Sequence, residues 1–227
     1  MALTLHHHPL SSSCHKVLIA LYELGIPFEG RFLNLGDPEE RARFVALWPT
    51  GKMPLLEDKG HVVPETTIII EHLVLRHARA AQTLIPADSQ AALEVRLMER
   101  LLDLYVMMPM QAIVADHLRA AADRDALAVA QASATLTTAY GLLERRLGER
   151  EWMAGNAFSM ADCTAAPALF YATTLVPLGD EQPRLASYFE RVVERPSVAR
   201  VLDEARPYFR FYPFSERLPR RFWSGDE

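Results

Sequence analysis

Two different hydrophobic patterns occupy separate parts of this chain, and the boundary between them constrains the fold more than any other feature. Before residue 80, short segments with β-type patterns are interleaved with helical segments, and Gly and Pro separate them. From Asp88 onward, apolar residues recur only at helical spacing. The change predicts an α/β domain over residues 1–79, a linker over 80–87, and an all-α helical bundle over 88–227.

The first domain is predicted to run strand, helix, strand, helix, hairpin and helix, which is the order βαβαββα. The strands are expected at 2–7, 28–33, 53–56 and 61–63, and the helices after Ser11, over 38–47 and after Pro64. Residues 68–70 are all isoleucine and alone would favour a strand, but their neighbours fit a helix better. This order implies a mixed sheet with helices on its faces.

Two apolar stripes run along the helical half. The first consists of Leu93, Leu97, Leu101, Leu104 and Met108. Pro109 is expected to kink the helix that carries it. The second consists of Leu136, Tyr140, Leu143 and Leu147. Further helices are expected from Ser159, where Asp162 completes a capping box, and over 182–195 and 197–205. The aromatic residues after Pro207 predict a tail that packs back on the body.

The composition argues against several kinds of partner. The net charge of −5 comes without a basic block, so nucleic acid is not expected, and no apolar run reaches the length of about 18 residues that spans a membrane. The N-terminus lacks the features of a signal peptide. Cys14 and Cys163 match no metal-binding spacing, so we expect a reducing, cytoplasmic setting. In a strand, His6 and His8 would face away from His7, which argues against a metal site.

Ser11, Ser12, Ser13 and Cys14 lie where the first strand turns into the first helix. A helix N-terminus presents unpaired N–H groups and a partial positive charge, which lower the pKa of a thiol bound there. A serine hydroxyl can also donate a hydrogen bond to such a sulfur. The local sequence alone favours the simpler alternative, in which the serines only cap the helix.

Two further motifs are able to present polar groups to a ligand. A cis bond between Met53 and Pro54 would leave the Met53 N–H and C=O open to an extended peptide, although an ordinary trans bond fits the sequence equally well. Glu65 and Thr66 open a helix directly after Pro64. Thr66 could hold a carboxylate there and Glu65 could accept from an ammonium group, although capping alone would also explain the pair.

The chain resembles the cytosolic glutathione transferase family in four stretches, namely LHHHPLSSSCHKVLIAL, WPTGKMPLLED, VVPETTIIIEHL and FSMADCTAAPAL. The similarity covers nearly the whole chain, and the order and spacing of the stretches make it specific. It implies a thioredoxin-like N-terminal domain followed by a helical C-terminal domain, usually in a homodimer. It also implies glutathione as co-substrate, a small hydrophobic electrophile as second substrate, and no metal.

The resemblance is to the serine-type classes of that family, the delta, zeta, theta, tau and phi classes. In these classes the activating hydroxyl lies six residues before a helix valine. Counting back from Val17 gives Ser11 as the catalytic residue, with Ser12 and Ser13 as alternates. Cys14 falls where delta-like members have a cysteine that they do not use.

The resemblance also implies the remaining site residues. Met53, before Pro54, would bind the cysteinyl part of glutathione through its backbone. Glu65 and Thr66 would hold the γ-glutamyl end, and Lys52 would meet the glycine carboxylate. The hydrophobic substrate site would be lined by Leu10, Tyr105, Met108 and His117.

The leading hypothesis is nucleophilic transfer, in which the glutathione thiolate attacks an electrophilic carbon and forms a thioether. Two alternatives stay open. One is a glutathione-dependent isomerase, peroxidase or reductase of the same fold, although the serine run lies one place away from the signature of the isomerising zeta class. The other is a non-catalytic glutathione-binding module, since a fold does not fix a function.

Overall fold

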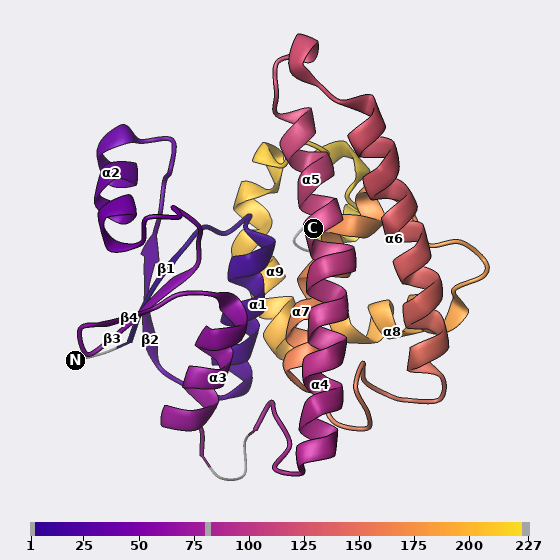
Figure 1. Cartoon of the computed structure of the whole chain (residues 1–227), viewed down its shortest axis with the longest axis horizontal. Coiled ribbons are helices and arrows are strands. Elements are labelled where there is room, and N and C mark those ends of the chain that lie inside the picture. Colours follow the sequence, from indigo (N-terminus) through magenta and orange to yellow (C-terminus); the bar gives the residue numbers. More distant parts are fainter. Residues whose placement is uncertain (1–2, 80–82, 224–227) are drawn as a thin grey trace.

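The computed structural model describes residues 3–79 and 83–223, and it places a small sheet beside a larger group of helices (Figure 1). Residue 2 of the predicted first strand and residues 80–82 of the predicted linker lie outside the described residues. In Figure 1 the sheet is at the left, and the helices that follow residue 88 fill the right. The α/β and all-α division that the sequence predicts is therefore confirmed.

The sheet has four strands in the order β2-β1-β3-β4. They are β1 (Leu3–His7), β2 (Phe28–Phe32), β3 (Leu55–Asp58) and β4 (His61–Val63). β1 runs parallel to β2 and antiparallel to β3, and β3 pairs with β4 in a hairpin, so the sheet is mixed as predicted. β3 begins two residues later than expected, after Pro54, which has no N–H to donate to a neighbouring strand.

Three helices pack on this sheet. They are α1 (Ser12–Glu23), α2 (Pro38–Leu47) and α3 (Thr66–Arg76). α1 and α3 lie between the sheet and the helical domain, and α2 lies on the opposite side (Figure 1). Beneath α2, Leu33, Phe44 and Leu55 form a small separate core. The isoleucine run is helical, because Ile69 and Ile70 are buried with Leu73 on one face of α3.

The helical domain contains α4 (Ser89–Leu102), α5 (Met108–His117), α6 (Ala126–Leu147), α7 (Met160–Leu175), α8 (Pro183–Val193) and α9 (Pro196–Ala205). A π-helical turn, η1 (Asp103–Met107), joins α4 to α5. The Met108 N–H bonds to the Asp103 carbonyl, five residues back, immediately before Pro109. The disturbance expected at Pro109 therefore takes the form of a π-helical turn ahead of the proline.

The two predicted stripes differ in burial. All four residues of the second stripe, on α6, are buried. In the first stripe, Leu93 and Met108 are 58% and 56% exposed, and α4 instead buries Val95, Met98 and Leu102. This helix carries apolar residues on two faces, and helical periodicity alone does not tell which face is the core.

Three other expectations for the helical domain can be compared with the structure. Ser159 and Asp162 form the predicted capping box. Phe209, Tyr212 and Phe214 are buried, so the aromatic tail packs on the body as expected. Among the described helices, α6 alone has the length and hydropathy of a membrane span, but it packs against α5 and α8 within the bundle.

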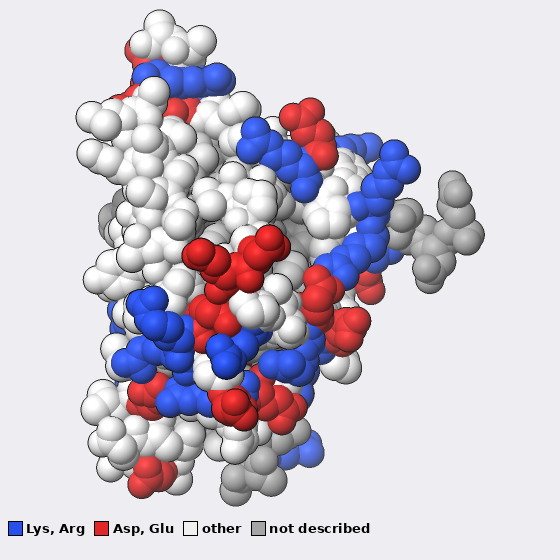
Figure 2. Space-filling view, turned by 90° about the vertical axis from the view of Figure 1, so that its right-hand side faces the viewer, with Lys and Arg blue, Asp and Glu red and all other residues white. Residues whose placement is uncertain are grey.

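Charged side chains of both signs occur on the face shown in Figure 2, mainly in the lower and right-hand parts of the view, while much of the upper left is uncharged. Figure 2 shows Lys and Arg side chains interspersed with Asp and Glu side chains on the face that it presents. That face carries no continuous positive surface of the kind that nucleic acid requires.

Candidate functional site

The turn after β1 is tightly hydrogen-bonded and sets the start of α1. Ser11 is the N-cap residue, with φ −79° and ψ 114°, and its hydroxyl oxygen accepts from the Cys14 N–H at 3.3 Å. The Ser11 N–H donates to the His8 carbonyl at 3.0 Å. The Ser11 hydroxyl oxygen accepts the first of these two bonds, and a hydroxyl that accepts a hydrogen bond can also donate its own proton, here to a ligand at the helix N-terminus.

A residue of the other domain contacts the two neighbouring serines. The Gln111 side-chain amide, on α5, donates to the hydroxyl oxygens of Ser12 at 3.1 Å and Ser13 at 3.2 Å. Sequence analysis missed Gln111, and the signal that could have found it is a lone amide in an otherwise apolar helical stretch. Gln111 donates to Ser12 and Ser13, whereas the Cys14 N–H donates to Ser11, so the hydroxyl oxygen of each of the three serines accepts one hydrogen bond.

Burial sets the titration of the two residues that follow the serines. Cys14 is fully buried, and desolvation raises the pKa of its thiol to about 11, outweighing the lowering effect of the neighbouring Ser11 side chain and His8 backbone. Such a thiol is neutral at physiological pH and is a poor nucleophile. Desolvation likewise lowers the pKa of His15 to about 4, so its ring is neutral. Its Nε2 lies 2.5 Å from the Pro9 carbonyl oxygen and holds the loop before the serines.

The second group of predicted residues lies at the start of β3 and of α3. The Met53–Pro54 bond is cis. Glu65 is exposed and has φ +66°, a left-handed conformation that is uncommon for a residue with a Cβ atom. Thr66 begins α3, so its N–H is one of the unpaired donors of the first turn. Lys52 is exposed, and its backbone N–H donates to the hydroxyl oxygen of Thr50 at 3.4 Å.

A buried ion pair fixes the first turn of α3 against the helical domain. Lys16 Nζ lies 2.5 Å from Glu99 Oε1, and both side chains are almost completely buried. The Thr67 hydroxyl donates to the same oxygen at 2.7 Å. Three helices, α1, α3 and α4, are therefore joined at one point next to Thr66, which gives the two domains a defined relative position.

An apolar cavity of about 390 Å³ adjoins the serine turn. It is bounded by Leu10, Ser11 and Ser12 of the first domain, by α5 and α7, and by the tail. The lining residues from those later elements are Met110, Gln111, Val114, Ala115, Leu118, Tyr171, Phe211, Tyr212 and Pro213. The cavity therefore combines two serines at a helix N-terminus with an apolar wall.

The four residues predicted for the apolar substrate site do not all meet there. Leu10 lines the cavity. Tyr105 instead lines a separate hollow against α6, and Met108 is exposed on the outer face. The His117 ring packs on Phe214, with 4.5 Å between ring centroids, next to the cavity-lining residues Leu118 and Pro213.

Comparison with known protein families decides what this chain is related to. The family described as "Glutathione S-transferase, N-terminal domain" matches residues 1–74, and the one described as "Glutathione S-transferase, C-terminal domain" matches residues 101–196. The chain belongs to the glutathione S-transferase family. The resemblance that the four sequence stretches indicated is thereby confirmed, together with the α/β and all-α architecture.

Relatives within this family span most of the chain. Glutathione S-transferase D7 of Anopheles gambiae is 30% identical over 165 residues, which cover 71% of this chain and 72% of that protein. Glutathione S-transferase F6 of Arabidopsis thaliana is 26% identical over 209 residues, which cover 86% of this chain and 96% of that protein.

Solved glutathione S-transferase structures superpose on the same two domains. One from Methylobacillus flagellatus, with glutathione bound, has a TM-score of 0.79 and 25% identity, covering 88% of this chain and 98% of its own. One from Methylobacterium radiotolerans, in complex with glutathione sulfonate, has a TM-score of 0.76 and 28% identity, covering 88% of this chain and 94% of its own.

Proposed function

We propose that this chain is an enzyme that conjugates glutathione to a small hydrophobic electrophile. The observation that carries the proposal is that Ser11, the N-cap residue of α1, lines the same cavity as an apolar wall. A thiolate held at Ser11 would therefore face the space in which an apolar substrate is buried. The family relationship and the glutathione-bound relatives support glutathione as the thiol.

In this proposal glutathione lies extended past the Met53–Pro54 segment. The Met53 backbone pairs with its cysteinyl part, and Glu65 and Thr66 receive its γ-glutamyl end. Lys52, which is exposed, is within the segment that would meet the glycine carboxylate. The assignments rest on the family resemblance and on the position of Thr66 at the start of α3, where an anion is stabilised by unpaired N–H groups.

The chemical step is a nucleophilic attack. The thiol proton leaves to water, and the Ser11 hydroxyl and the N-terminus of α1 stabilise the resulting anion. The sulfur then forms a bond to the electrophilic carbon, and the bonding electrons leave with a departing group or move into an adjacent acceptor. A thiol pKa lowered by about two units corresponds to about 2.7 kcal/mol of preference for the anion, which a charged hydrogen bond and a helix end together can supply.

Replacement of Ser11 tests this assignment. In Ser11→Ala, the pKa of bound glutathione should rise by about one to two units, because the hydrogen bond to the charged sulfur is lost. An ultraviolet titration of the thiolate in the complex measures it. Ser12→Ala and Ser13→Ala are the matched controls and should leave that pKa near the wild-type value. If the pKa is unchanged in Ser11→Ala and rises in Ser12→Ala or Ser13→Ala, the serine replaced in that control is the one that stabilises the thiolate.

The reaction type needs a separate measurement. Turnover of a model aryl halide, of maleylacetoacetate and of an organic peroxide distinguishes transfer from isomerisation and reduction. We expect the aryl halide to be the best of the three. Calorimetry that detects no glutathione binding would contradict the proposal as a whole and would favour a non-catalytic module.

We also propose that the chain forms a homodimer in the cytoplasm. Exposed apolar residues on α4, on η1 and at the start of α5 support the dimer, because Leu93, Tyr105 and Met108 are 58%, 47% and 56% exposed. A second copy would remove this apolar area from water. Sedimentation velocity should give a dimer, and a monomer at all concentrations would contradict the proposal. Both cysteines are free and buried, which agrees with a reducing setting.

A further inference from the structure

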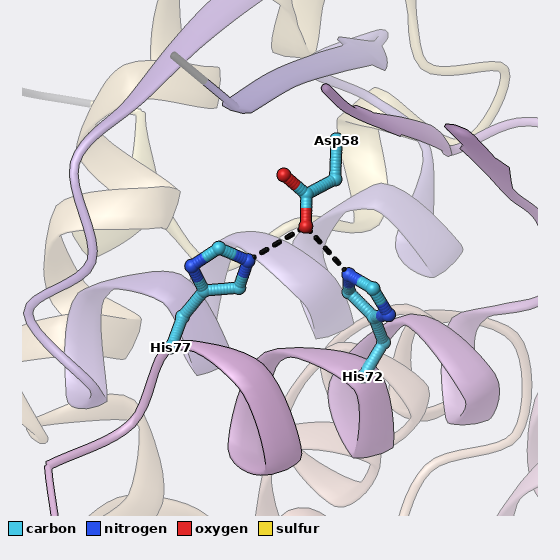
Figure 3. Close-up of side chains that lie close together, drawn as sticks. All are labelled: Asp58, His72 and His77. Carbon is cyan, nitrogen blue, oxygen red and sulfur yellow. Dashed lines mark hydrogen bonds and ion pairs between the residues drawn. The ribbon is translucent and has the colours of Figure 1, made fainter. Parts of the chain in front are cut away.

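Three polar side chains converge at the end of α3 that is remote from the serine turn. Figure 3 shows Asp58, at the end of β3, between the imidazole rings of His72 and His77. The Nε2 atoms of His72 and His77 lie 2.9 Å and 2.8 Å from the same oxygen, Asp58 Oδ2. Neither the glutathione chemistry proposed above nor the apolar cavity uses any of these groups.

The backbone holds this cluster in position from two sides. Asp58 precedes a tight hairpin turn in which Lys59 and Gly60 have φ values of +51° and +87°, and the ladder of β3 and β4 fixes the residues around it. His72 lies within α3. His77 is the C-cap of that helix and has φ −130°, so it leaves the helical path.

That departure explains how two histidines five positions apart can share a partner. On a regular helix, residues five apart point in different directions, and only residues three or four apart are neighbours. Because His77 is no longer helical, its ring lies beside His72, with 5.8 Å between ring centroids. Sequence spacing gave no sign of this cluster, and the expectation of no metal rested on the two cysteines, the histidine run at residues 6–8 and the family resemblance.

The geometry points to a site for a divalent transition-metal ion of the Zn²⁺ type, and we propose that Asp58, His72 and His77 are its ligands. One ligand atom from each residue lies within 4.8 Å of the others. A tetrahedral ion with bond lengths of about 2.0–2.2 Å needs ligand atoms about 3.4 Å apart, so the present nitrogen–oxygen distances require only a small expansion.

The donor set selects the class of metal. Two neutral imidazoles and one carboxylate suit Zn²⁺ and its first-row neighbours, whereas Mg²⁺ and Ca²⁺ prefer oxygen ligands only. The C-terminal end of α3 also contributes a partial negative charge, which favours a cation there.

The cluster has access to solvent. The side chains of His72 and His77 are each 22% exposed, and that of Asp58 is 11% exposed. A hollow of about 520 Å³ is lined by Asp58 and His77, together with Glu29, Lys59 and Arg79. Three protein ligands with an open side leave room for water or a further ligand in the fourth position.

Titration of the full-length wild-type chain with Zn²⁺ tests the site, with binding measured by calorimetry after chelator treatment. We expect one ion per chain at this site. The Zn²⁺ affinity should fall at least about tenfold in each of Asp58→Asn, His72→Gln and His77→Gln. Loss of a residue that only supports a metal ligand already costs about 10–100-fold, so loss of a ligand should cost no less. The amide replacements keep hydrogen-bonding groups in the cluster. His61→Gln, on the exposed part of the same hairpin, is the matched control and should bind as the wild type does.

The histidine run at residues 6–8 requires its own control, because three consecutive imidazoles could also bind Zn²⁺. His8→Gln should retain the Zn²⁺ affinity of the wild type. If zinc binding is lost in His8→Gln and kept in His77→Gln, the proposal is overturned. It is equally overturned if the wild-type chain binds no Zn²⁺, since the cluster is then only a set of hydrogen bonds.

A measurement without any variant guards against misfolded replacements. Long-range ¹H–¹⁵N spectra of the wild-type chain report on each imidazole nitrogen. On addition of Zn²⁺, the Nε2 resonances of His72 and His77 should shift, while those of His61 should not. Shifts confined to the histidines of residues 6–8 would contradict the assignment.

Discussion

The two ends of α3 carry opposite chemistry. At the first end, Thr66 presents a hydroxyl and an unpaired N–H beside the exposed Glu65, which suits an anion. At the other end, Asp58 and two histidines form a cluster that suits a cation. The helix has 11 residues, so the two ends are about 16 Å apart.

The difference follows from the helix itself. A helix N-terminus exposes N–H groups and a C-terminus exposes carbonyl groups, so a single helix offers an electropositive and an electronegative end. What differs is how each end is held. At the first end, Thr67 of α3 and Lys16 of α1 bond to Glu99 of the helical domain. Midway along α3, Glu71 pairs with Arg96 of the same domain, and at the second end His72 and His77 bond to Asp58 of the hairpin. The first end should therefore depend on the domain interface more directly than the second.

The largest effect is expected from removing Lys16. In Lys16→Met, Glu99 would remain as a buried charge without its partner, which typically costs about 3–5 kcal/mol. Urea unfolding measures the free energy of unfolding. The double variant Lys16→Met/Glu99→Leu should recover most of the loss, because an apolar pair of similar volume replaces both charges. A loss below about 1 kcal/mol in Lys16→Met would show that this pair does not hold the first end of α3.

Acid should lower the free energy of unfolding through His15, which lies next to the serine turn. Burial lowers the pKa of His15 to about 4 in the folded protein, against 6.5 for an unperturbed histidine. Between these values the unfolded chain binds more protons than the folded one, so the free energy of unfolding falls as the pH falls from about 6.5 to about 4. Above pH 6.5 the ring is neutral in both states, so His15 no longer makes the free energy of unfolding depend on pH. The full difference between the two pKa values corresponds to about 3 kcal/mol.

Unfolding experiments across this pH range check the role of His15. His15→Gln keeps a donor near the Pro9 carbonyl but removes the titration, so its stability should fall less with acid than that of the wild type. His61→Gln, an exposed histidine, should follow the wild-type curve. Equal acid sensitivity in His15→Gln and the wild type would mean that other groups carry the effect.

A smaller effect is expected from Thr66. Thr66→Ala removes one hydroxyl from the anion end and should raise the glutathione Kd about tenfold, in keeping with a hydrogen bond to a charged group. Thr66→Ser keeps the hydroxyl and should stay within about twofold of the wild type. Zn²⁺ affinity at the other end should be the same in all three proteins. A parallel loss of both ligands in Thr66→Ala would show that the two ends are not independent.

Much of the fold follows from local sequence signals. Asp37 and Pro38 begin α2 at the predicted residue, and the apolar spacing on α6 gave its buried face correctly. The first stripe on α4 did not give its buried face, because the choice between two apolar faces depends on what packs against them. The cis bond at Pro54 was one of two open alternatives, since proline permits both isomers.

The candidate site was accessible to sequence reasoning only where its residues are adjacent in the chain. The serines and the pair Glu65–Thr66 each lie at a helix start, which a local motif marks. Gln111 contacts Ser12 and Ser13 from 99 and 98 residues away, and Glu99 contacts Thr67 from 32 residues away. Such contacts depend on how the domains pack, and no local pattern encodes them. The cluster at Asp58 depends on the departure of His77 from the helix.

A crystal structure of the chain with glutathione bound tests the central claim most directly. The account predicts the glutathione sulfur within hydrogen-bonding distance of the Ser11 hydroxyl, with the tripeptide running beside Met53 and its γ-glutamyl end at Thr66. A sulfur turned toward Gln111 and away from Ser11, or a tripeptide bound elsewhere on the chain, would contradict it.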